Sequence, residues 1–331
     1  MTDRRLKTLK LSEWQTIIER NRWFGHWAAK TLQRIESEVV FSYAYVAKLP
    51  FLEAKRQNAS CILGQIDGGP QEDLLVKELT HGYHHLGLPD VHAPAPESYW
   101  CQWRDEIALA DKIIVNSHWS RSLLCKASVP EDKIVEIPLV YAARSSPLLP
   151  SHTKASTDIH RNHTKTGRLQ VLYLGSLILR KGLGQLLAAI TSLHGEAIDF
   201  TFAGPIGISI PDHILAMSNV TFLGPVDSLT ATSLYQRADV FLFPTLSDGF
   251  GLTQLEALAQ GLPVIASQHC GRVVDDRVNG LLLEEVTPEA ICAAILILHR
   301  DRELLEHLRS NAAVPEKFTP GHLIDFLRAL E

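Results

Sequence analysis

Cysteine is scarce in this sequence and follows no pairing pattern. The five cysteines are an odd number, and no two of them form a CxxC motif. Disulfide frameworks and thiolate zinc sites depend on even or closely spaced cysteines. We therefore expect neither, and a reduced cytoplasmic setting fits this usage best. The cysteines are Cys61, Cys101, Cys125, Cys270 and Cys292.

Long apolar runs and acidic metal motifs are absent as well. No stretch reaches the roughly 18 apolar residues of a membrane-spanning helix. The first residues, MTDRR, are not followed by the apolar core of a secretory signal. The sequence contains no Asp-x-Asp motif. We expect a cytoplasmic protein that needs no metal ion and no other cofactor.

Neither sign of charge is in large excess. The formal net charge is −5, with 46% hydrophobic and 21% charged residues. This composition is that of an ordinary globular protein, and it excludes a disordered chain and a generally basic nucleic-acid binder. A chain of 331 residues exceeds the size at which one core usually stops growing, so two domains are expected.

The least regular composition lies in the middle of the chain. Residues 143–168 are rich in Ser, Thr, His and basic residues and show no hydrophobic period, which is typical of an exposed linker. We predict an N-terminal domain at 1–142, a linker at 143–168 and a C-terminal domain at 169–331.

After the linker, apolar runs of strand length alternate with segments of helical spacing, such as 182–194 and 252–260. This alternation predicts a parallel sheet covered on both faces, that is, a doubly wound α/β domain. Ligands of such folds bind beyond the carboxyl ends of the strands. The expected strands are 169–176, 198–204, 220–226, 238–245, 262–267 and 280–285.

Before the linker the same alternation is weaker, with a helix expected at 73–86. We predict a second Rossmann-like domain that faces the first. The fold class is therefore α/β with two Rossmann-like domains, the N-terminal one reduced. Its expected strands are 38–46, 60–66, 112–117 and 132–138.

The stretch SDGFG follows the expected strand 238–245 and precedes a helix. Amides at a helix N-terminus attract anions, and glycine lets the backbone approach a phosphate closely. Asp248 and Glu256 would stand about 10 Å apart, which suits two polyol groups that flank a diphosphate. The alternatives are a plain N-cap for Asp248 and a solvated helix position for Glu256.

A second loop of this kind follows the expected strand 169–176. Arg180 and Lys181 come directly before a helix that Gly182 opens. Two cations beside a helix N-terminus would neutralise a diphosphate. The alternative is a pair of solvated surface charges.

These loops and the segments around them resemble a known family. The stretches VLYLGSLILRKGLGQLLAAI, VTFLGPVDSLTATSLYQRADVFLFPTLSDGFGLTQLEALAQGLPVIAS and GRVVDDRVNGLLLEEVTPEAICAAI are similar to the donor-binding half of the retaining GT-B glycosyltransferases of family 4, also called glycosyl transferases group 1. The resemblance covers residues 169 to about 315. Residues 110–141 are similar to the end of the family's acceptor domain. The last helix, about 318–331, resembles one that packs back on the N-terminal domain.

The resemblance implies a hexosyltransferase-type enzyme. Such an enzyme moves a sugar from a nucleoside diphosphate sugar to a hydroxyl with retention of configuration, by front-face attack and without an enzymic nucleophile. The implied partners are the nucleotide-sugar donor and a glycan, lipid-linked or small-molecule acceptor, with no nucleic acid. Glycan or surface polysaccharide biosynthesis in the cytoplasm, with peripheral contact at the inner face of the membrane, would suit this family.

By position, the resemblance assigns catalysis to Asp248, Lys181 and Arg180. The two cations would contact the diphosphate, Asp248 the transferred sugar, Glu256 the ribose, and the base would lie near Val226. Asp248 stands where the family usually has Glu. Ser176 stands where many members have Arg, so Arg180 is the expected substitute. The implied donor-binding residues are Gly175, Ser176, Val226, Gly249, Phe250, Gly251, Leu252, Thr253 and Glu256.

The sequence departs from the family at its front. Family members usually begin with a strand and a Gly-rich loop, whereas residues 1–37 predict a helix with Trp14, Trp23 and Trp27. We interpret it as a packing helix that covers the sheet edge. A membrane-surface or partner helix is the alternative.

Polar residues in the N-terminal half give weaker signals. Gln65 lies at the end of the expected strand 60–66 and Asp67 directly follows it. Many family members have a His near this position. We predict Asp67 as a polar contact on the acceptor side.

Two further groups favour structural interpretations. His81, His84 and His85 share one expected helix but lack the HExxH pattern, so we predict surface or packing roles. Ser117 and Ser120 precede a helix and are expected to cap it.

Other function classes remain open. A non-catalytic nucleotide-sugar-binding or scaffold protein on the same fold would bind a nucleotide without turnover. A phosphorylase or epimerase of the same fold matches the two loops less well. A nicotinamide dehydrogenase is disfavoured, because GFGLTQ lacks the third glycine and does not follow the domain's first strand.

Overall fold

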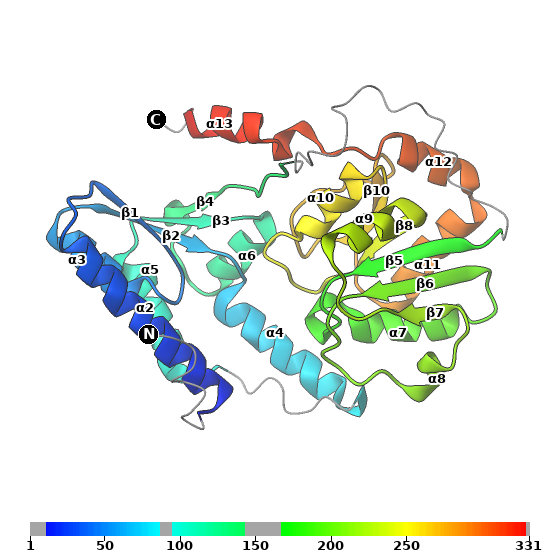
Figure 1. The fold of residues 1–331 in the computed structure, drawn as a ribbon, viewed down its shortest axis with the longest axis horizontal. Helices are drawn as coiled ribbons and strands as arrows, with labels where there is room; N and C mark the ends of the chain where they lie inside the picture. The colour runs from blue at the N-terminus through cyan, green and yellow to red at the C-terminus, as the bar shows by residue number, and fades with distance from the viewer. Residues whose placement is uncertain (1–10, 87–94, 143–166, 329–331) are drawn as a thin grey trace. The chain divides into compact units, whose positions relative to one another are not determined.

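The computed structural model describes residues 11–86, 95–142 and 167–328 (Figure 1). The chain divides into two compact units, one of Met1–Glu78 with His92–Ile137 and one of Leu79–Val91 with Pro138–Glu331. Each unit is an α/β structure with a single parallel sheet. Most of the expected linker, residues 143–166, lies outside the described residues.

The first unit contains a four-stranded parallel sheet in the order β1-β2-β3-β4. All four strands expected in this half are confirmed, with tighter bounds. The first is shorter because Tyr45 adopts a φ of 76°, outside the β region. The strands are β1 (Val39–Tyr43), β2 (Ser60–Gln65), β3 (Lys112–Val115) and β4 (Ile134–Glu136).

Helices follow the strands of the first unit as a Rossmann-like alternation requires. The expected helix at 73–86 is confirmed as α4, which starts earlier and ends at Gly82, with its last residues in the second unit. The helices are α2 (Glu13–Leu32), α3 (Lys48–Arg56), α4 (Gly69–Gly82), α5 (Glu97–Leu109) and α6 (His118–Lys126), with 3-10 turns η1 (His84–Leu86) and η2 (Glu131–Lys133).

The Trp-rich helix α2 packs mainly against α3 rather than against the sheet. Gly25 is its buried residue, and a Cβ there would lie 3.6 Å from Leu49 Cδ1. Trp14 contacts Tyr99 with ring centroids 5.0 Å apart. The packing interpretation is therefore right for this inner face, but covering the sheet edge is not the main role of α2.

The second unit has a six-stranded parallel sheet in the order β10-β9-β8-β5-β6-β7. All six expected strands are present. The strand expected at 220–226 ends at Phe222, because Gly224 adopts a φ of 68°. The strands are β5 (Leu169–Leu174), β6 (Ile198–Ala203), β7 (Val220–Phe222), β8 (Val240–Phe243), β9 (Val264–Ser267) and β10 (Gly280–Leu283).

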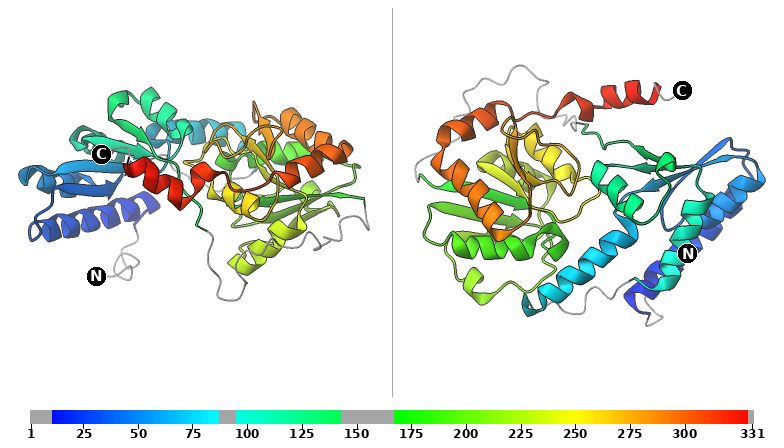
Figure 2. Two further views of the ribbon diagram at one scale, coloured as in Figure 1. Left: turned by 90° about the horizontal axis from the view of Figure 1, so that it is seen from above. Right: turned by 180° about the vertical axis from the view of Figure 1, so that it is seen from behind.

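Helices cover both faces of this sheet (Figures 1 and 2). Val240 and Leu242 of β8 join the core beneath α7 and α11, while Phe241 and Phe243 join the core beneath α9 and α10. Burial on both faces explains the continuous apolar strands of the sequence. The helices are α7 (Leu183–Ser192), α8 (Asp212–Leu215), α9 (Ser228–Arg237), α10 (Leu252–Ala259), α11 (Pro288–Arg300), α12 (Arg302–Ser310) and α13 (Pro320–Arg328), with 3-10 turns η3 (Leu179–Lys181) and η4 (Glu316–Phe318).

Helix α13 lies within the expected last helix, and the structure assigns it to the second unit. Its contact with the N-terminal domain stays a prediction.

Candidate functional site

The second sheet has one topological switch point, between β5 and β8. From β5 the chain proceeds outward through β6 and β7, whereas from β8 it proceeds the opposite way through β9 and β10. The loops after β5 and β8 therefore leave the sheet on neighbouring strands and diverge. In open α/β sheets such a point is where ligands bind. Both loops singled out in the sequence meet here.

The loop after β5 is fitted tightly against the loop after β8. Gly182 opens α7 with a φ of 76°, and a Cβ at this position would lie 1.9 Å from the carbonyl oxygen of Pro244. Only glycine allows this approach. The 3-10 turn η3 just before it carries Arg180 and Lys181.

Arg180 joins the two loops through its main chain and its side chain. Its carbonyl oxygen accepts from the amide of Leu246 at 2.9 Å, and its guanidinium donates to the carbonyl oxygen of Ser247 at 2.7 Å. The Arg180 side chain is therefore directed at the β8 loop. Its expected contact with a diphosphate stays a prediction.

Lys181 and Asp248 form an ion pair across the two loops. Both side chains are more than four-fifths buried, with 16% and 17% exposure. The ammonium of Lys181 also lies 5.3 Å from the ring centroid of Phe243. Water screens a pair at this depth less than it screens a surface pair.

Hydrogen bonds of both its backbone amide and its side-chain carboxylate hold Asp248 in place. Its amide donates to the carbonyl oxygen of His269 at 2.9 Å, and its carboxylate accepts from the amide of Phe250 at 3.1 Å. The Asp248 carboxylate thus turns back on its loop as an N-cap would, although the helix begins only after Gly251, which has a φ of 83°. The N-cap of α10 is Gly251, so the alternative of a plain N-cap is wrong for Asp248: one carboxylate oxygen bonds to its own loop, and Lys181 engages the other.

The predicted donor-binding residues of this loop divide by their exposure. Phe250 is buried and packs edge-on against Phe318 with centroids 5.6 Å apart, so its side chain belongs to the core. Gly251 and Thr253 are half-buried and Leu252 is exposed at the first turn of α10. The amide of Phe250 is engaged by Asp248. The anion-binding role predicted for the amides from Gly249 to Thr253 remains a prediction.

Glu256 lies on α10 and accepts a hydrogen bond from the hydroxyl of Tyr235 at 3.0 Å. Tyr235 comes from α9 and is buried. Burial and the nearby Glu256 carboxylate raise the pKa of Tyr235 far above its usual range, so its hydroxyl stays a donor. Glu256 is therefore an anchored carboxylate rather than the freely solvated helix residue that was the alternative.

Sequence reasoning missed Tyr235 because nothing in its local pattern distinguishes it from a core aromatic residue. It also missed Thr245 and Ser267, which join the ends of β8 and β9. The hydroxyl of Ser267 donates to the carbonyl oxygen of Thr245 at 2.5 Å. Their positions at strand ends were the available signal.

The remaining predicted donor residues lie along the same edge of the sheet. Gly175 and Ser176 directly follow β5, and Ser176 is exposed. Val226 follows β7, two strands from β5, which places its strand roughly 10 Å away along the edge. The position of Val226 near the base of a nucleotide stays a prediction.

Asp67 in the first unit is part of a hydrogen-bonded network. One carboxylate oxygen accepts from the hydroxyl of Tyr45 at 2.6 Å, from the side-chain amide of Gln65 at 2.6 Å and from the amide of Gly69 at 3.0 Å. Trp103 in turn donates to Gln65 at 2.9 Å. These contacts fix the loop after β2. An acceptor contact by Asp67 stays a prediction.

The structure also shows where Ser117, Ser120 and two of the histidines lie. Ser117 accepts from the amide of Ser120 at 3.1 Å and is the N-cap of α6, so its capping role is confirmed, whereas Ser120 is a buried residue of that helix. His81 and His84 are exposed at the end of α4 and in η1. Within residues 11–86, 95–142 and 167–328, no three His, Cys, Asp or Glu side chains form a group suited to a metal ion.

In the part of the chain that the structure describes, no helix is both long enough and apolar enough to cross a bilayer.

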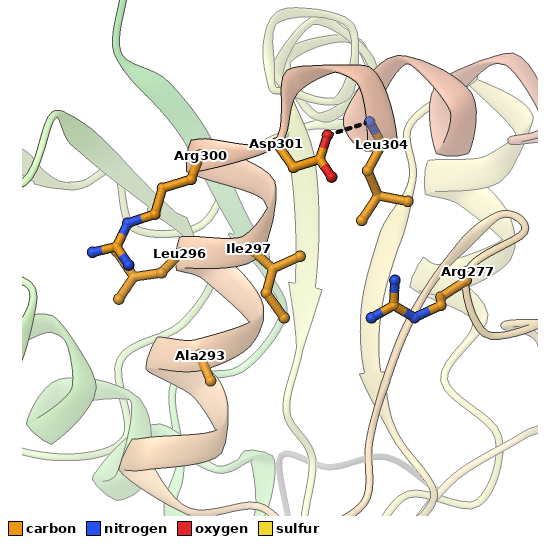
Figure 3. A pocket seen from close by; sticks show the side chains of 7 residues that line it. All are labelled: Arg277, Ala293, Leu296, Ile297, Arg300, Asp301 and Leu304. Carbon is orange, nitrogen blue, oxygen red and sulfur yellow. Dashed lines mark hydrogen bonds between the residues drawn. The ribbon is translucent and has the colours of Figure 1, made fainter.

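A surface depression elsewhere on the second unit offers little chemistry (Figure 3). Arg277 precedes β10, and Arg300 ends α11, which places both at the amino edge of the sheet, opposite the two loops. The Asp301 carboxylate accepts from the amide of Leu304 at 2.8 Å as the N-cap of α12. The depression is therefore a surface feature away from the switch point. Its lining residues are Arg277, Ala293, Leu296, Ile297, Arg300, Asp301 and Leu304.

Part of this chain is similar in sequence to known proteins. Residues 168–301, which contain both loops, match the model of the family described as Glycosyl transferases group 1. An uncharacterized glycosyltransferase of Methanocaldococcus jannaschii is 28% identical over 159 residues, which cover 45% of this chain and 41% of that protein. A D-inositol 3-phosphate glycosyltransferase of Actinosynnema mirum is 27% identical over 215 residues, 60% of this chain and 51% of that protein. The chain thus spans about half the length of these curated relatives, or less.

The likeness to solved structures extends over most of the chain. The Anabaena protein HepE, crystallised in complex with UDP, matches with a TM-score of 0.66 at 17% identity, covering 92% of this chain and 81% of that one. The structural neighbours are GT-B glycosyltransferases with two Rossmann-like domains, so the predicted fold class is confirmed.

Proposed function

We propose that this chain, with a glycosyl transferases group 1 match over its switch-point loops, transfers a hexose from a nucleoside diphosphate sugar to a hydroxyl acceptor with retention of configuration. The observation that carries the proposal is the meeting of Lys181 and Asp248 at the β5–β8 switch point. A cation and a carboxylate from two loops there match the two chemistries of a donor, its anionic diphosphate and its polyol sugar.

The diphosphate belongs beside Lys181, Arg180 and the first amides of α10. The ion pair with Asp248 holds Lys181 at the strand ends before a donor arrives. A diphosphate would give Lys181 a second anion beside Asp248, and the Asp248 carboxylate would accept from the sugar hydroxyls. Fixed charges that need no reorganisation stabilise the negative charge that grows on the leaving diphosphate.

The proposed transfer step needs no nucleophile from the enzyme. The bond between the anomeric carbon and the diphosphate oxygen breaks, and the acceptor oxygen bonds to the same face of that carbon. The acceptor's proton passes to the departing diphosphate oxygen. The protein's part is to position both substrates and to stabilise the leaving charge.

Glu256 would hold the ribose of the donor. Its carboxylate accepts from Tyr235 at 3.0 Å and has further lone pairs for ribose hydroxyls. Because α9 and α10 both pack into one core beneath the sheet, this carboxylate is held on a rigid support.

The proposal also covers the acceptor and the need for a metal ion. We propose a glycan, lipid-linked or small-molecule hydroxyl as acceptor, in glycan or surface polysaccharide biosynthesis. We also propose that no metal ion takes part, because Lys181, Arg180 and the amides supply the positive charge. EDTA should leave the initial rate unchanged within about twofold, whereas a metal-dependent transferase would lose its activity.

A donor screen tests the function. Purified protein is incubated with UDP-, GDP-, ADP- and dTDP-sugars, with and without simple sugar acceptors, and thermal shift and release of nucleoside diphosphate are both measured. One donor class should stabilise the protein and release its nucleoside diphosphate. Proton NMR of a transferred product should show the donor's anomeric configuration.

Glu256→Gln and Glu285→Gln provide the matched pair for this screen. Glu285 is an exposed glutamate beyond β10, outside the site. Loss of a charged hydrogen bond to ribose should weaken donor binding about 10- to 100-fold in the first variant only. Stabilisation without release would favour the non-catalytic binding protein, and absence of any donor binding would overturn the proposal.

A further inference from the structure

The four-stranded sheet of the first unit has its helices on one face. Its strands follow the chain order β1-β2-β3-β4, and right-handed crossovers place the connecting helices of such a sheet on the same side. Accordingly, α3, α5 and α6 all contribute to one core, and in Figure 1 they lie below the strands. The strand residues of this core are Val40, Cys61, Leu63, Ile113, Val115 and Ile134.

The opposite face of the same sheet is apolar too. Residues in register on parallel strands share a face, and Phe41 pairs with Ile62, Gly64 with Ile114, and Ile114 with Val135. We call the apolar side chains of this face the outer sheet face. Among the residues that the structure describes, none of them belongs to or packs against a hydrophobic core. They are Val39, Phe41, Tyr43, Ile62, Ile114 and Val135.

The outer sheet face is most exposed on the edge strand β1. Val39, Phe41 and Tyr43 are 55%, 50% and 57% exposed. The rings of Phe41 and Tyr43 meet edge to face with centroids 5.2 Å apart. Both rings lean over Gly64, where a Cβ would lie 2.7 Å from Phe41 Cζ. The two rings therefore extend the apolar surface from β1 over β2.

A parallel sheet with one uncovered face is unusual. Such sheets occur almost only where both faces are covered. Aromatic side chains present about 200 Å² each, so roughly 100 Å² of Phe41 and of Tyr43 is open to solvent. The six side chains together expose on the order of 400 Å², a size at which apolar patches are often functional. The outer sheet face is therefore a surface for a partner.

A second copy of the chain suits this surface. Two sheets pack face to face about 10 Å apart, and a two-fold axis would bring two identical faces together. Contact of like with like is favourable here, because all six side chains are uncharged. The charged strand residue in register with this face is Lys112, whose ammonium donates to the carbonyl oxygen of Asp132 at 3.0 Å.

The area also agrees with a dimer. Since about two-thirds of a homodimer interface is apolar, the roughly 800 Å² of two such faces corresponds to about 1,200 Å² of total burial. Specific, stable interfaces begin at about this size. We propose that the chain forms a two-fold homodimer in which the outer sheet faces of two copies pack against each other.

Helix α13 is a less suitable cover for this face. It has apolar side chains of its own, since Ile324 is 49% and Leu327 45% exposed. Its nine residues form a rod about 14 Å long and about 10 Å wide. Such a rod covers about two strands of a sheet whose four strands span roughly 15 Å, whereas a second sheet covers all four. The proposal goes beyond sugar transfer and needs no donor to be tested.

Sedimentation velocity tests the proposal on the full chain. An interface near the lower size limit should dissociate in the micromolar range, so the protein is measured between about 0.5 and 50 µM. The weight-average mass should rise from that of a monomer to that of a dimer. The transition should persist at high salt, because salt screens charges and the outer sheet face has none.

Three variants test whether β1 carries the contact. Phe41→Lys should raise the dimer dissociation constant at least about 100-fold, because a two-fold interface contains the change twice and brings two ammonium groups together. Phe41→Leu keeps the surface apolar and should stay within about tenfold of the native chain. The matched control is Leu215→Lys on α8, which should stay within about twofold, because Leu215 is 56% exposed and lies outside the face.

Photo-cross-linking identifies what covers the face. A benzophenone amino acid in place of Phe41 should link one copy to the strands β1 to β4 of another. Far-UV circular dichroism checks that every variant is folded. A monomer throughout the concentration range, or a dimer that Phe41→Lys leaves intact, would overturn the proposal. So would cross-links within a monomer to Pro320–Arg328 or to another segment, which would assign the face to that segment.

Discussion

At the scale of single residues, Tyr235 shows how a buried side chain can act through a neighbour. It is buried, and its hydroxyl donates to Glu256, the residue predicted to hold ribose. A buried donor that stays protonated keeps this carboxylate in one place. We classify Tyr235 as a positioning residue of the proposed donor site.

Removal of this hydroxyl should affect donor affinity more than turnover. We expect Tyr235→Phe to raise the KM for the donor about fivefold, the cost of one hydrogen bond, while kcat changes less than twofold. Tyr43→Phe, an exposed tyrosine on β1, is the control. Steady-state kinetics distinguish this result from a general loss of folded protein, which would lower the apparent kcat and leave KM unchanged.

Asp111 gives a residue-scale prediction about pH. The amide of Cys61 donates to its carboxylate at 2.7 Å, and Lys55 pairs with it, which together lower the pKa of Asp111 below its usual value. A depressed pKa in the folded state stabilises the protein above the ordinary pKa of about 4, and this stabilisation is lost as the pH falls through the folded value.

Asp111→Asn should therefore destabilise the protein at neutral pH and much less in acid. We expect a loss of about 1 kcal/mol in the free energy of unfolding at pH 7, because the amide of Cys61 then bonds to a neutral group. Urea denaturation at pH 7 and pH 3 measures both values. An equal loss at the two pH values would contradict the assigned charge.

At the scale of elements, the contact between the β5 and β8 loops depends on Gly182. A side chain there would meet the carbonyl oxygen of Pro244 at 1.9 Å, in addition to the strain of a φ of 76°. Because the nearest atoms belong to the backbone of Pro244, no flexible side chain can move aside to make room. The position of Lys181, one residue earlier, is tied to the same contact.

Gly182→Ala should separate these two costs when it is compared with Gly195→Ala. Gly195 also has a positive φ, 93°, but an added Cβ there meets nothing within 4 Å. We expect about 1 kcal/mol of destabilisation for Gly195→Ala and at least about 3 kcal/mol for Gly182→Ala, with donor binding impaired only in the latter. Thermal denaturation and donor titration provide the two readings. Equal destabilisation by the two variants would show that the fit against Pro244 is loose.

The elements were the part of the structure that the sequence predicted best. Buried parallel strands are apolar on both faces, so β8 appeared as an uninterrupted apolar run and β5 and β9 as predominantly apolar ones. Their bounds were less accurate at β1 and β7, where single residues with positive φ, Tyr45 and Gly224, lie just past the strand ends. Such backbone conformations depend on tertiary context rather than on local pattern.

Contacts between distant residues could not be predicted in the same way. Lys181 and Asp248 were each chosen from their own loops, but their pairing depends on the order of strands in the sheet. The link between Tyr235 and Glu256 joins two helices that only the fold brings together. The outward orientation of Trp23 and Trp27 likewise follows from the choice of α3 as the packing partner of α2.

In the whole molecule, the two compact units contain different polar sites. The second unit contains the switch point and the proposed donor site. The first contains the hydrogen-bonded network of Asp67, Tyr45 and Gln65.

The most direct test of the central claim is the dependence of nucleotide affinity on the diphosphate. Isothermal titration compares the nucleoside, its monophosphate and its diphosphate, for the base that the donor screen selects, on the native chain and on Lys181→Ala. The account predicts that the native chain binds the diphosphate at least about tenfold more tightly than the monophosphate, and that Lys181→Ala removes most of this preference. Equal affinity for the two phosphates, or a preference that survives in Lys181→Ala, would contradict a diphosphate site at the β5–β8 switch point.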